Sequence, residues 1–233
     1  MFLVEGRSVV LEAVASGAEV HDVFVHEELD DPALHQALEV SAATPVTVAR
    51  DVIEMLSETV TPQGVVAVVA APGHDLEVVR DASLAVVLAQ VRDPGNAGTL
   101  IRSATAAGAD AVVFSSGSVD PLHPKVVRSA AGAVFRVPIV RSVALEEALT
   151  ALREAGIRII GTSTRGGVDL YEVDLAEPSA FVLGNEAWGL PGEVEEAVDV
   201  LVGIPMPGPA ESLNVSIAGS ILLFEALRQR RPG

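Results

Sequence analysis

Residues 84–114 read LAVVLAQVRDPGNAGTLIRSATAAGADAVVF, and the expected architecture of the chain follows from them. The apolar runs 84–89 and 111–114 have the length and composition of buried strands, and residues 96–107 between them have the spacing of a helix. A strand–helix–strand unit of this kind joins two parallel strands. The stretch therefore predicts an α/β fold with a mostly parallel sheet.

The same alternation continues on both sides of this stretch. Towards the C-terminus we expect strands at 137–140, 157–161, 180–183 and 200–204 and helices at 124–131, 145–155 and 212–230. Towards the N-terminus we expect strands at 20–25, 46–48 and 65–69 and helices at 8–15, 33–42 and 51–56. The sequence therefore predicts a small α/β domain at residues 1–72, a linker at 73–82 and a larger domain at 83–233 with helices on both faces of its sheet.

The composition excludes several classes of site. The 233 residues contain no cysteine, which excludes disulfides, cysteine-ligated zinc, iron–sulfur clusters and a cysteine nucleophile. The five histidines lack metal-ligand spacing, so no metal is expected. No apolar run approaches the ~20 residues that cross a bilayer, so we expect a cytoplasmic protein without membrane contact.

The net charge is −17, from 32 acidic and 15 basic side chains. Residues 1–80 hold 14 acidic and 3 basic side chains and so carry most of this charge. A passive nucleic-acid coat needs a basic surface to replace counterions, so the charge alone argues against that function.

Unusual residues gather after the first strand of the larger domain, at 91–102. Asp93-Pro94-Gly95 turns the chain, and Asn96 is expected to cap the following helix. Gly98 leaves room for a close approach to the backbone. Arg102 leans back towards the start of the helix, where its guanidinium would reach the edge of the sheet. A capped helix with a solvent-facing arginine explains this loop equally well.

Two later loops also break the local pattern. Residues 183–191, LGNEAWGLP, follow an apolar strand and hold the only tryptophan, and an ordinary strand-to-helix turn is the alternative interpretation. Residues 204–216, IPMPGPAESLNVS, form a rigid path before the last helix, which Ser212 or Asn214 can cap. That helix is apolar on nearly all sides, so it should pack against the protein or a second subunit. Neither a dinucleotide fingerprint nor a P-loop occurs.

Taken together, the three loops resemble the motifs of the SpoU (TrmH-type) RNA ribose 2′-O-methyltransferases of the SPOUT superfamily. The motifs are Asn96-x-Gly98-x-x-x-Arg102, then Gly184-Asn185-Glu186, then Ile204-Pro205-Met206 with residues 212–216. Residues 124–133 are similar to a further family segment, and the resemblance covers about residues 83–230. Residues 6–13 and 62–67 resemble the ends of the small ribosomal-protein-like domain with which many members bind RNA.

The resemblance implies a homodimer with a C-terminal trefoil knot that transfers a methyl group from S-adenosylmethionine to a ribose 2′-hydroxyl of RNA. It implies that the methyl donor is held at Gly161, Thr162, Leu183, Gly184, Ile204, Met206 and Leu213. The polar site positions that it implies are Asn96, Arg102, Glu186, Ser212 and Asn214. We expect RNA contacts at Arg92, Lys125 and Arg128, with Arg136 nearby.

A guanidinium is always protonated in proteins, so Arg102 is a poor general base. We expect it instead to stabilise alkoxide character on the 2′-oxygen and to clamp the adjacent phosphate. The missing cysteine fits oxygen methylation, because methylation of pyrimidine C5 usually proceeds through a cysteine adduct.

Other functions remain open at this point. Ribosomal RNA is favoured as substrate by the ribosomal-protein-like domain, and transfer RNA is the alternative. A catalytically inactive RNA-binding protein of the same fold would have lost the polar site residues, all of which are present. A methyltransferase acting on a protein or a small molecule is a third interpretation, which the acidic surface would explain.

Overall fold

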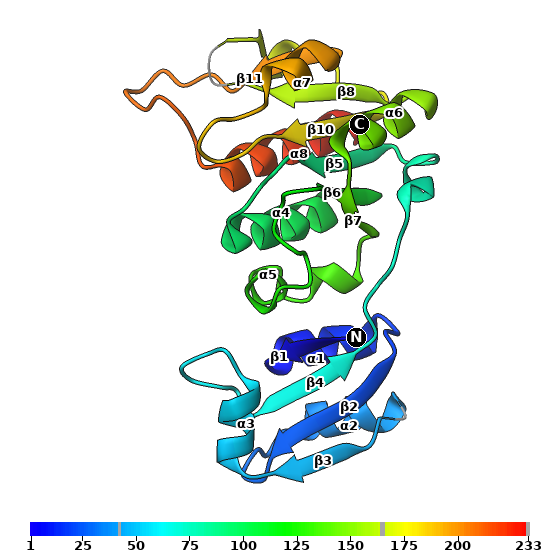
Figure 1. Ribbon diagram of the computed structural model, residues 1–233, viewed down its shortest axis with the longest axis vertical. Coiled ribbons are helices and arrows are strands. Elements are labelled where there is room, and N and C mark those ends of the chain that lie inside the picture. Colours follow the sequence, from blue (N-terminus) through cyan, green and yellow to red (C-terminus); the bar gives the residue numbers. More distant parts are fainter. Residues whose placement is uncertain (42, 164–165, 232–233) are drawn as a thin grey trace.

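The computed structural model describes residues 1–41, 43–163 and 166–231. Two separate sheets follow one another along the chain, the smaller at the bottom and the larger at the top of Figure 1. The α/β class that the sequence predicts is confirmed. None of the helices in the described part of the chain has the length and hydropathy that a bilayer crossing requires.

The smaller sheet has the strand order β1-β4-β2-β3. Its elements are β1 (Phe2–Glu5), α1 (Arg7–Ala15), β2 (Val20–His26), α2 (Pro32–Val40), β3 (Pro45–Val48), α3 (Arg50–Leu56) and β4 (Val65–Val69). Strand β4 is antiparallel to β1 and β2, and β2 is parallel to β3. Asp31 caps α2 by accepting the Leu34 N–H, with Pro32 in the first turn. The expected end of this helix at Ala42 lies outside the described residues.

The larger sheet has seven strands in the order β7-β6-β5-β10-β8-β11-β9, and all neighbouring pairs are parallel. Its strands are β5 (Leu84–Leu88), β6 (Ala111–Ser115), β7 (Ile139–Val143), β8 (Arg158–Thr162), β9 (Val168–Asp169), β10 (Ser179–Leu183) and β11 (Val200–Gly203). Strand β7 begins later than the sequence predicts, because Pro138 has no N–H for the ladder and offers only its carbonyl, to Val112.

Helices cover both faces of this sheet, as expected. They are α4 (Pro94–Ala107), α5 (Pro124–Ser129), α6 (Leu145–Glu154), α7 (Gly192–Ala197) and α8 (Val215–Arg230), with short 3₁₀ turns η1 (Leu76–Val79), η2 (Ala133–Phe135) and η3 (Leu170–Glu172). Successive residues of β5 point to opposite faces, so Val86 joins a core beneath α4 and α8, whereas Val87 joins a second core beneath α6 and α7. Both layers are visible in Figure 1.

Helix α4 approaches α5 closely at Gly98. A Cβ on Gly98 would lie 2.5 Å from Ser129 Cβ and 2.5 Å from the Val126 carbonyl oxygen. The close approach that Gly98 permits is therefore made by α5, not by a ligand. This glycine positions the first motif loop by fixing the helix that follows it.

The N-terminal part of the chain, which holds the smaller sheet, and the C-terminal part, which holds the larger sheet, share a core and two ion pairs. Apolar residues of α1 and α5 belong to one buried cluster. Arg128 of α5 lies 3.6 Å from Glu5, measured from Nη1 to Oε2, and Arg136 donates to Glu12. Two arginines close to the motifs are thus paired with carboxylates of the acidic N-terminal part.

Helix α8 begins at Val215, three residues later than the sequence predicts. Gly219 lets it lie against α4 and β10, where a Cβ would come within 2.4 Å of Leu100 and 2.6 Å of Leu183. The opposite side is open, since Ile217 is 50% and Phe224 48% exposed. The expectation of a helix buried all round therefore holds for one side only in a single chain.

Candidate active site

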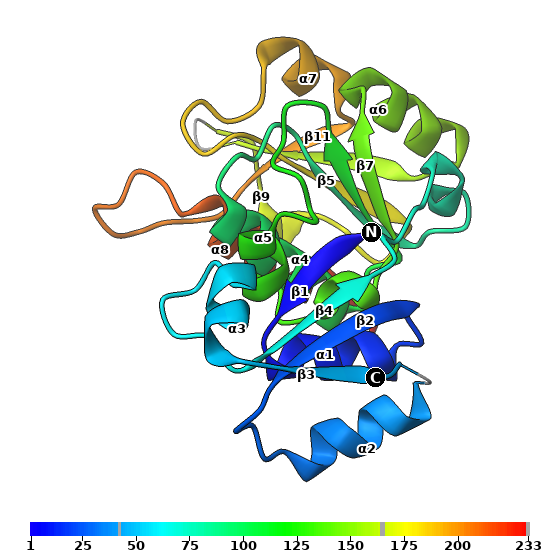
Figure 2. The ribbon, with the colours of Figure 1, turned by 60° about the horizontal axis from the view of Figure 1, so that its bottom comes forward.

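The three motif loops meet at one edge of the larger sheet. They follow β5, β10 and β11, which run parallel, so their carboxyl ends face the same way. Ligands of open parallel sheets usually bind outside this edge. Figure 2 shows the loop before α8 projecting away from the body of the protein.

Glu186 of the second loop binds the backbone and side chains of the first. Its carboxylate accepts the Arg92 N–H at 3.3 Å, the Asp93 N–H at 3.0 Å and the Asn96 Nδ2 at 3.2 Å. Burial raises the pKa of Glu186, but hydrogen bonds from its own amide, Asn96 and the two other backbone amides outweigh burial and hold that pKa below its usual value. Glu186 is therefore ionised at neutral pH and clamps the two loops together.

Asn96 extends this network to the third motif. Its Oδ1 accepts the Asn214 Nδ2 at 2.9 Å. Asn214 Oδ1 in turn accepts the Ser216 N–H at 2.8 Å and the Ile217 N–H at 3.4 Å, which caps α8. A continuous chain of polar contacts thus runs from Glu186 through Asn96 to the start of α8.

The residue that caps α4 is Asp93, and the expectation that Asn96 caps it is wrong. Helix α4 begins at Pro94, and Asp93 caps it by accepting the Asn96 N–H at 2.8 Å. Aspartate caps helices as well as asparagine does, and proline suits the first helical position. The Asn96 side chain is consequently left for Glu186 and Asn214.

A cleft of about 830 Å³ opens between these loops. Among the predicted site residues, those that line it are Asn96, Thr162, Gly184, Glu186, Ile204, Met206, Ser212, Leu213 and Asn214. Gly184 lies so close to the turn after it that a Cβ would come within 2.3 Å of the Gly189 carbonyl carbon. The absence of a side chain at Gly184 therefore lets the turn at Gly189 pack against the end of β10.

The other predicted residues lie outside this lining. Leu183 is fully buried in β10, and Gly161 of β8 packs against α7 and β11, where a Cβ would be 3.0 Å from both Val198 and Leu201. Arg102 is exposed on α4, and its side chain makes no hydrogen bond or ion pair with any residue that the structure describes. Lys125 is exposed on α5.

Asn185 is a site residue to which sequence reasoning gives no role. It is 6% exposed, donates from Nδ2 to the Gln90 carbonyl at 2.8 Å and accepts the Ala187 N–H at 2.8 Å. Gln90 has a positive φ of 58°, which is uncommon outside glycine. Asn185 thus fixes the strained turn after β5, and its place in the Gly-Asn-Glu motif is the signal that marks it.

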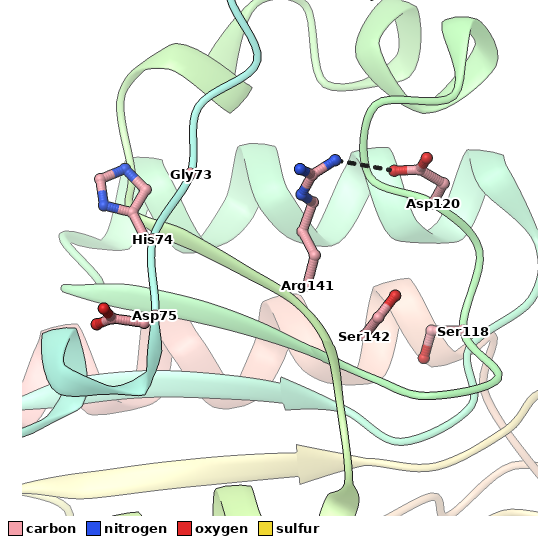
Figure 3. Close-up of a pocket in the computed structure, with 7 residues that line it drawn as sticks. All are labelled: Gly73, His74, Asp75, Ser118, Asp120, Arg141 and Ser142. Atoms are coloured by element: carbon pink, nitrogen blue, oxygen red, sulfur yellow. Dashed lines mark ion pairs between the residues drawn. The ribbon is translucent and has the colours of Figure 1, made fainter.

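A second pocket of about 660 Å³ lies beside the segment that joins the two parts (Figure 3). Arg141 faces Asp120 there at 3.9 Å, with His74 on the opposite side. The Asp120 and Ser118 side chains are engaged by the Leu122 N–H and the Leu88 carbonyl. None of the three motif loops contributes to this pocket, so the cleft remains the candidate active site.

No group of three histidine, cysteine, aspartate or glutamate side chains in the described part of the chain is placed to hold a metal ion. The described lining of the cleft carries the carboxylates of Asp169, Glu186 and Glu195 and no lysine or arginine. These three carboxylates make the cleft attractive to a positively charged ligand.

Comparison with known proteins assigns the chain to a family. Residues 83–224 match the model of the SpoU rRNA methylase family, and residues 3–74 match the model described as RNA 2′-O ribose methyltransferase substrate binding. A 23S rRNA (guanosine(2553)-2′-O)-methyltransferase of Bacillus subtilis, RlmP, is 36% identical over 96% of this chain and 87% of its own length. A 23S rRNA (uridine(2479)-2′-O)-methyltransferase of Streptomyces viridochromogenes is 36% identical over 100% of this chain and 84% of its own length.

The solved structures agree. The AdoMet-bound rRNA methyltransferase from Sinorhizobium meliloti superimposes with a TM-score of 0.88, at 32% identity, over 99% of this chain and 88% of its own. The three motifs that converge on the cleft and the matches over both parts of the chain lead to one conclusion: this protein belongs to the SpoU rRNA methylase family.

Proposed function

We propose that the protein transfers a methyl group from S-adenosylmethionine to a ribose 2′-hydroxyl of ribosomal RNA. The observation that carries the proposal is the hydrogen-bonded chain from Glu186 through Asn96 to Asn214, which holds all three family motifs around one cleft. Relatives that match nearly the whole chain are named as 23S rRNA 2′-O-methyltransferases. They modify different nucleotides, so the nucleotide modified here is left open.

The cleft fits the methyl donor in size and charge. Its volume of about 830 Å³ falls within the roughly 300–1,000 Å³ of small-molecule sites. Its three carboxylates suit a ligand with a sulfonium and an ammonium group. Gly184, Thr162, Ile204, Met206 and Leu213 line its walls. Gly161 and Leu183 do not line the cleft, and we expect them to support its wall through the packing of β8 and β10.

Bound S-adenosylmethionine supplies a methyl group that its sulfonium makes electrophilic. The reaction forms the bond between this methyl carbon and the ribose 2′-oxygen, breaks the carbon–sulfur bond, and releases the hydroxyl proton and S-adenosylhomocysteine. The role of Arg102 is to bind the developing alkoxide and the neighbouring phosphate. Glu186, Asn96 and Asn214 hold the loops that orient donor and ribose, and Ser212 lines the cleft beside them.

The N-terminal part, residues 1–72, would bind the RNA, with residues 73–82 as linker and residues 83–233 as the methyltransferase domain. Arg92 and Lys125 are exposed and their side chains have no carboxylate partner among the described residues, whereas Arg128 is paired with Glu5. A smaller RNA contribution is therefore expected from Arg128 than from the other two. The cytoplasm, where ribosomal RNA resides in bacteria, is the expected location.

A homodimer and a trefoil knot complete the proposal. The knot is supported by the family match over residues 83–224. The dimer is supported by the exposed apolar side of α8 at Ile217 and Phe224. It is also supported by Arg102, which is exposed outside the cleft of its own chain and would be brought to a site by a second subunit.

Incubation with methyl-labelled S-adenosylmethionine and unmodified RNA, followed by digestion to nucleosides, tests the activity. Label in a 2′-O-methyl nucleoside of 23S rRNA is the expected result. Label in transfer RNA alone would move the substrate to that class. Label in protein, or none in any acceptor, would contradict the proposal.

A further inference from the structure

Trp188, the only tryptophan of the chain, stands at the opening of the cleft. It lies on a turn that two backbone hydrogen bonds close, Asn185 N–H to Gly189 O at 3.0 Å and Gly189 N–H to Asn185 O at 2.9 Å. The Trp188 residue is 52% exposed. Its half-exposed ring presents a flat aromatic surface at the cleft that a planar ligand group can contact.

Arg92 lies against this ring. Its guanidinium carbon is 5.2 Å from the ring centroid, a cation–π arrangement. The backbone of Arg92 is held in turn by Glu186, which accepts its N–H. The backbone at both residues is therefore held by the motif loops, and the Arg92 guanidinium is placed by its contact with the Trp188 ring.

The flat Trp188 ring and Arg92 guanidinium match the flat face of an unpaired RNA base. Proteins recognise unpaired RNA bases by stacking them on aromatic rings and on arginine planes. An enzyme that acts on a nucleotide within folded RNA must move that nucleotide out of its stack, and a protein surface that replaces the lost stacking lowers the cost of doing so.

We infer that Trp188 and Arg92 form a stacking platform for the unstacked base of the nucleotide whose ribose is methylated. The inference rests on the proposed function and adds to it the contact that holds the target nucleotide. Trp188 acts here as a positioning residue, because it orients the ribose through the base and does not touch the reacting atoms.

The adenine of the methyl donor is the other ring that Trp188 could contact, and the charges favour the RNA base. Arg92 carries a positive charge beside the ring, which repels the sulfonium of the donor and attracts the phosphates that flank an RNA base. The acidic lining of Asp169 and Glu195 offers the donor a better environment elsewhere in the cleft.

Fluorescence of Trp188 tests the contact directly, because no other tryptophan contributes. The full-length protein is titrated with a single-stranded RNA 12-mer of mixed sequence, with an abasic ribose-phosphate 12-mer, and with S-adenosylmethionine alone. Saturable quenching by the RNA that exceeds that by the abasic chain is expected. Equal responses to the two oligomers, no response to RNA, or a response to S-adenosylmethionine as large as that to RNA would overturn the platform.

Variant kinetics on in vitro transcribed 23S rRNA provide a second readout. Trp188→Leu removes the π face while keeping an apolar side chain, and we expect KM for RNA to rise about tenfold, the order of one lost base–aromatic stack. Trp188→Phe keeps a ring and should restore most of this loss. The dissociation constant for S-adenosylmethionine, measured by calorimetry, should stay unchanged in both variants.

Arg92→Ala should raise the same KM, and Arg141→Ala serves as its control because Arg141 lies in the separate pocket of Figure 3. Unchanged KM in Trp188→Leu, or a loss that Phe does not restore, would contradict the inference. Base-dependent quenching without methyl transfer to any RNA would contradict the proposed function, and base stacking on Trp188 would then stand without a link to methylation.

Discussion

The side-chain amide of Asn214 donates to the side-chain oxygen of Asn96 at 2.9 Å, across 118 positions of sequence. This contact joins the helix that follows the first motif to the helix that follows the third. Because Asn96 also donates to Glu186, one amide group coordinates all three motifs. This amide therefore ties the three sides of the cleft together.

Asn96→Ala should lower both stability and activity. It removes one hydrogen bond to an ionised carboxylate and one to an amide, and we expect a loss of about 1–3 kcal/mol in the free energy of unfolding. Urea unfolding and methyl transfer to RNA measure the two effects. Thr99→Ala, at a half-buried position farther along α4, is the control. Equal stability of the two variants would show that the network contributes nothing to the fold.

Gly98→Ala should destabilise the protein without any ligand present. The added Cβ would meet Ser129 and the backbone of α5 at 2.5 Å, so α4 and α5 must separate, at a cost of about 1–3 kcal/mol. The midpoint of urea unfolding checks this. Gly73→Ala, where nothing lies within 4 Å of the new Cβ, should shift the midpoint little. A stable Gly98→Ala protein that only loses donor binding would instead restore the ligand-approach interpretation.

Much of the fold is predictable from the apolar runs. Strands such as β5 and β6 are continuous buried segments, and the period changes to that of a helix between them. Strand β9 is missed because two residues are too few to show a period, and β1 is missed because Phe2, Leu3 and Val4 show no alternation. The strand order could not be predicted, since β10 lies between β5 and β8 through contacts distant in sequence.

The candidate site is also predictable only in part. The motifs mark which loops matter, and most of their residues line the cleft. The contacts that these side chains make are not local in sequence, however. Glu186 reaches a helix 90 positions earlier, and Arg128, expected to meet RNA, faces Glu5 in the acidic N-terminal part. The first pairing depends on the strand order of the larger sheet and the second on how the two parts dock, and neither spacing nor charge counts reveal these.

Acid should loosen the motif loops through Glu186. The folded-state pKa of Glu186 is depressed, so its ionised form stabilises the fold above the pKa of the unfolded chain, and this contribution is lost as pH falls through the folded value. Glu186→Gln should therefore be less stable than the unsubstituted protein at pH 7, and the difference should shrink at acidic pH below 4.5. Urea unfolding at several pH values measures it. With the exposed Glu196→Gln as reference, a difference independent of pH would rule out the clamp.

Lys125→Glu should weaken RNA binding and make it less sensitive to salt. Each lost phosphate contact reduces the slope of log affinity against log salt by about one. Filter binding of 23S rRNA fragments at several salt concentrations gives the slope, with Arg80→Glu, an exposed arginine paired with Glu77, as control. Arg128→Glu is a poorer test, because it places a second carboxylate beside Glu5 and disturbs docking as well. An unchanged slope for Lys125→Glu would remove α5 from the RNA surface.

Arg102→Ala should slow the chemical step while leaving donor binding intact. The guanidinium is exposed and makes no ion pair with the described residues, so its removal costs the fold little. Loss of a preorganised donor to a developing oxyanion lowers rates by about 10²–10³, and Arg102→Lys should not restore the rate because lysine lacks the planar fork. Single-turnover methyl transfer measures the rate, and Arg141→Ala controls for loss of a surface charge. Mixing Arg102→Ala subunits with Glu186→Ala subunits adds a sharper test. If Arg102 serves the cleft of a partner, mixed dimers regain one intact site, and no recovery would confine Arg102 to its own chain.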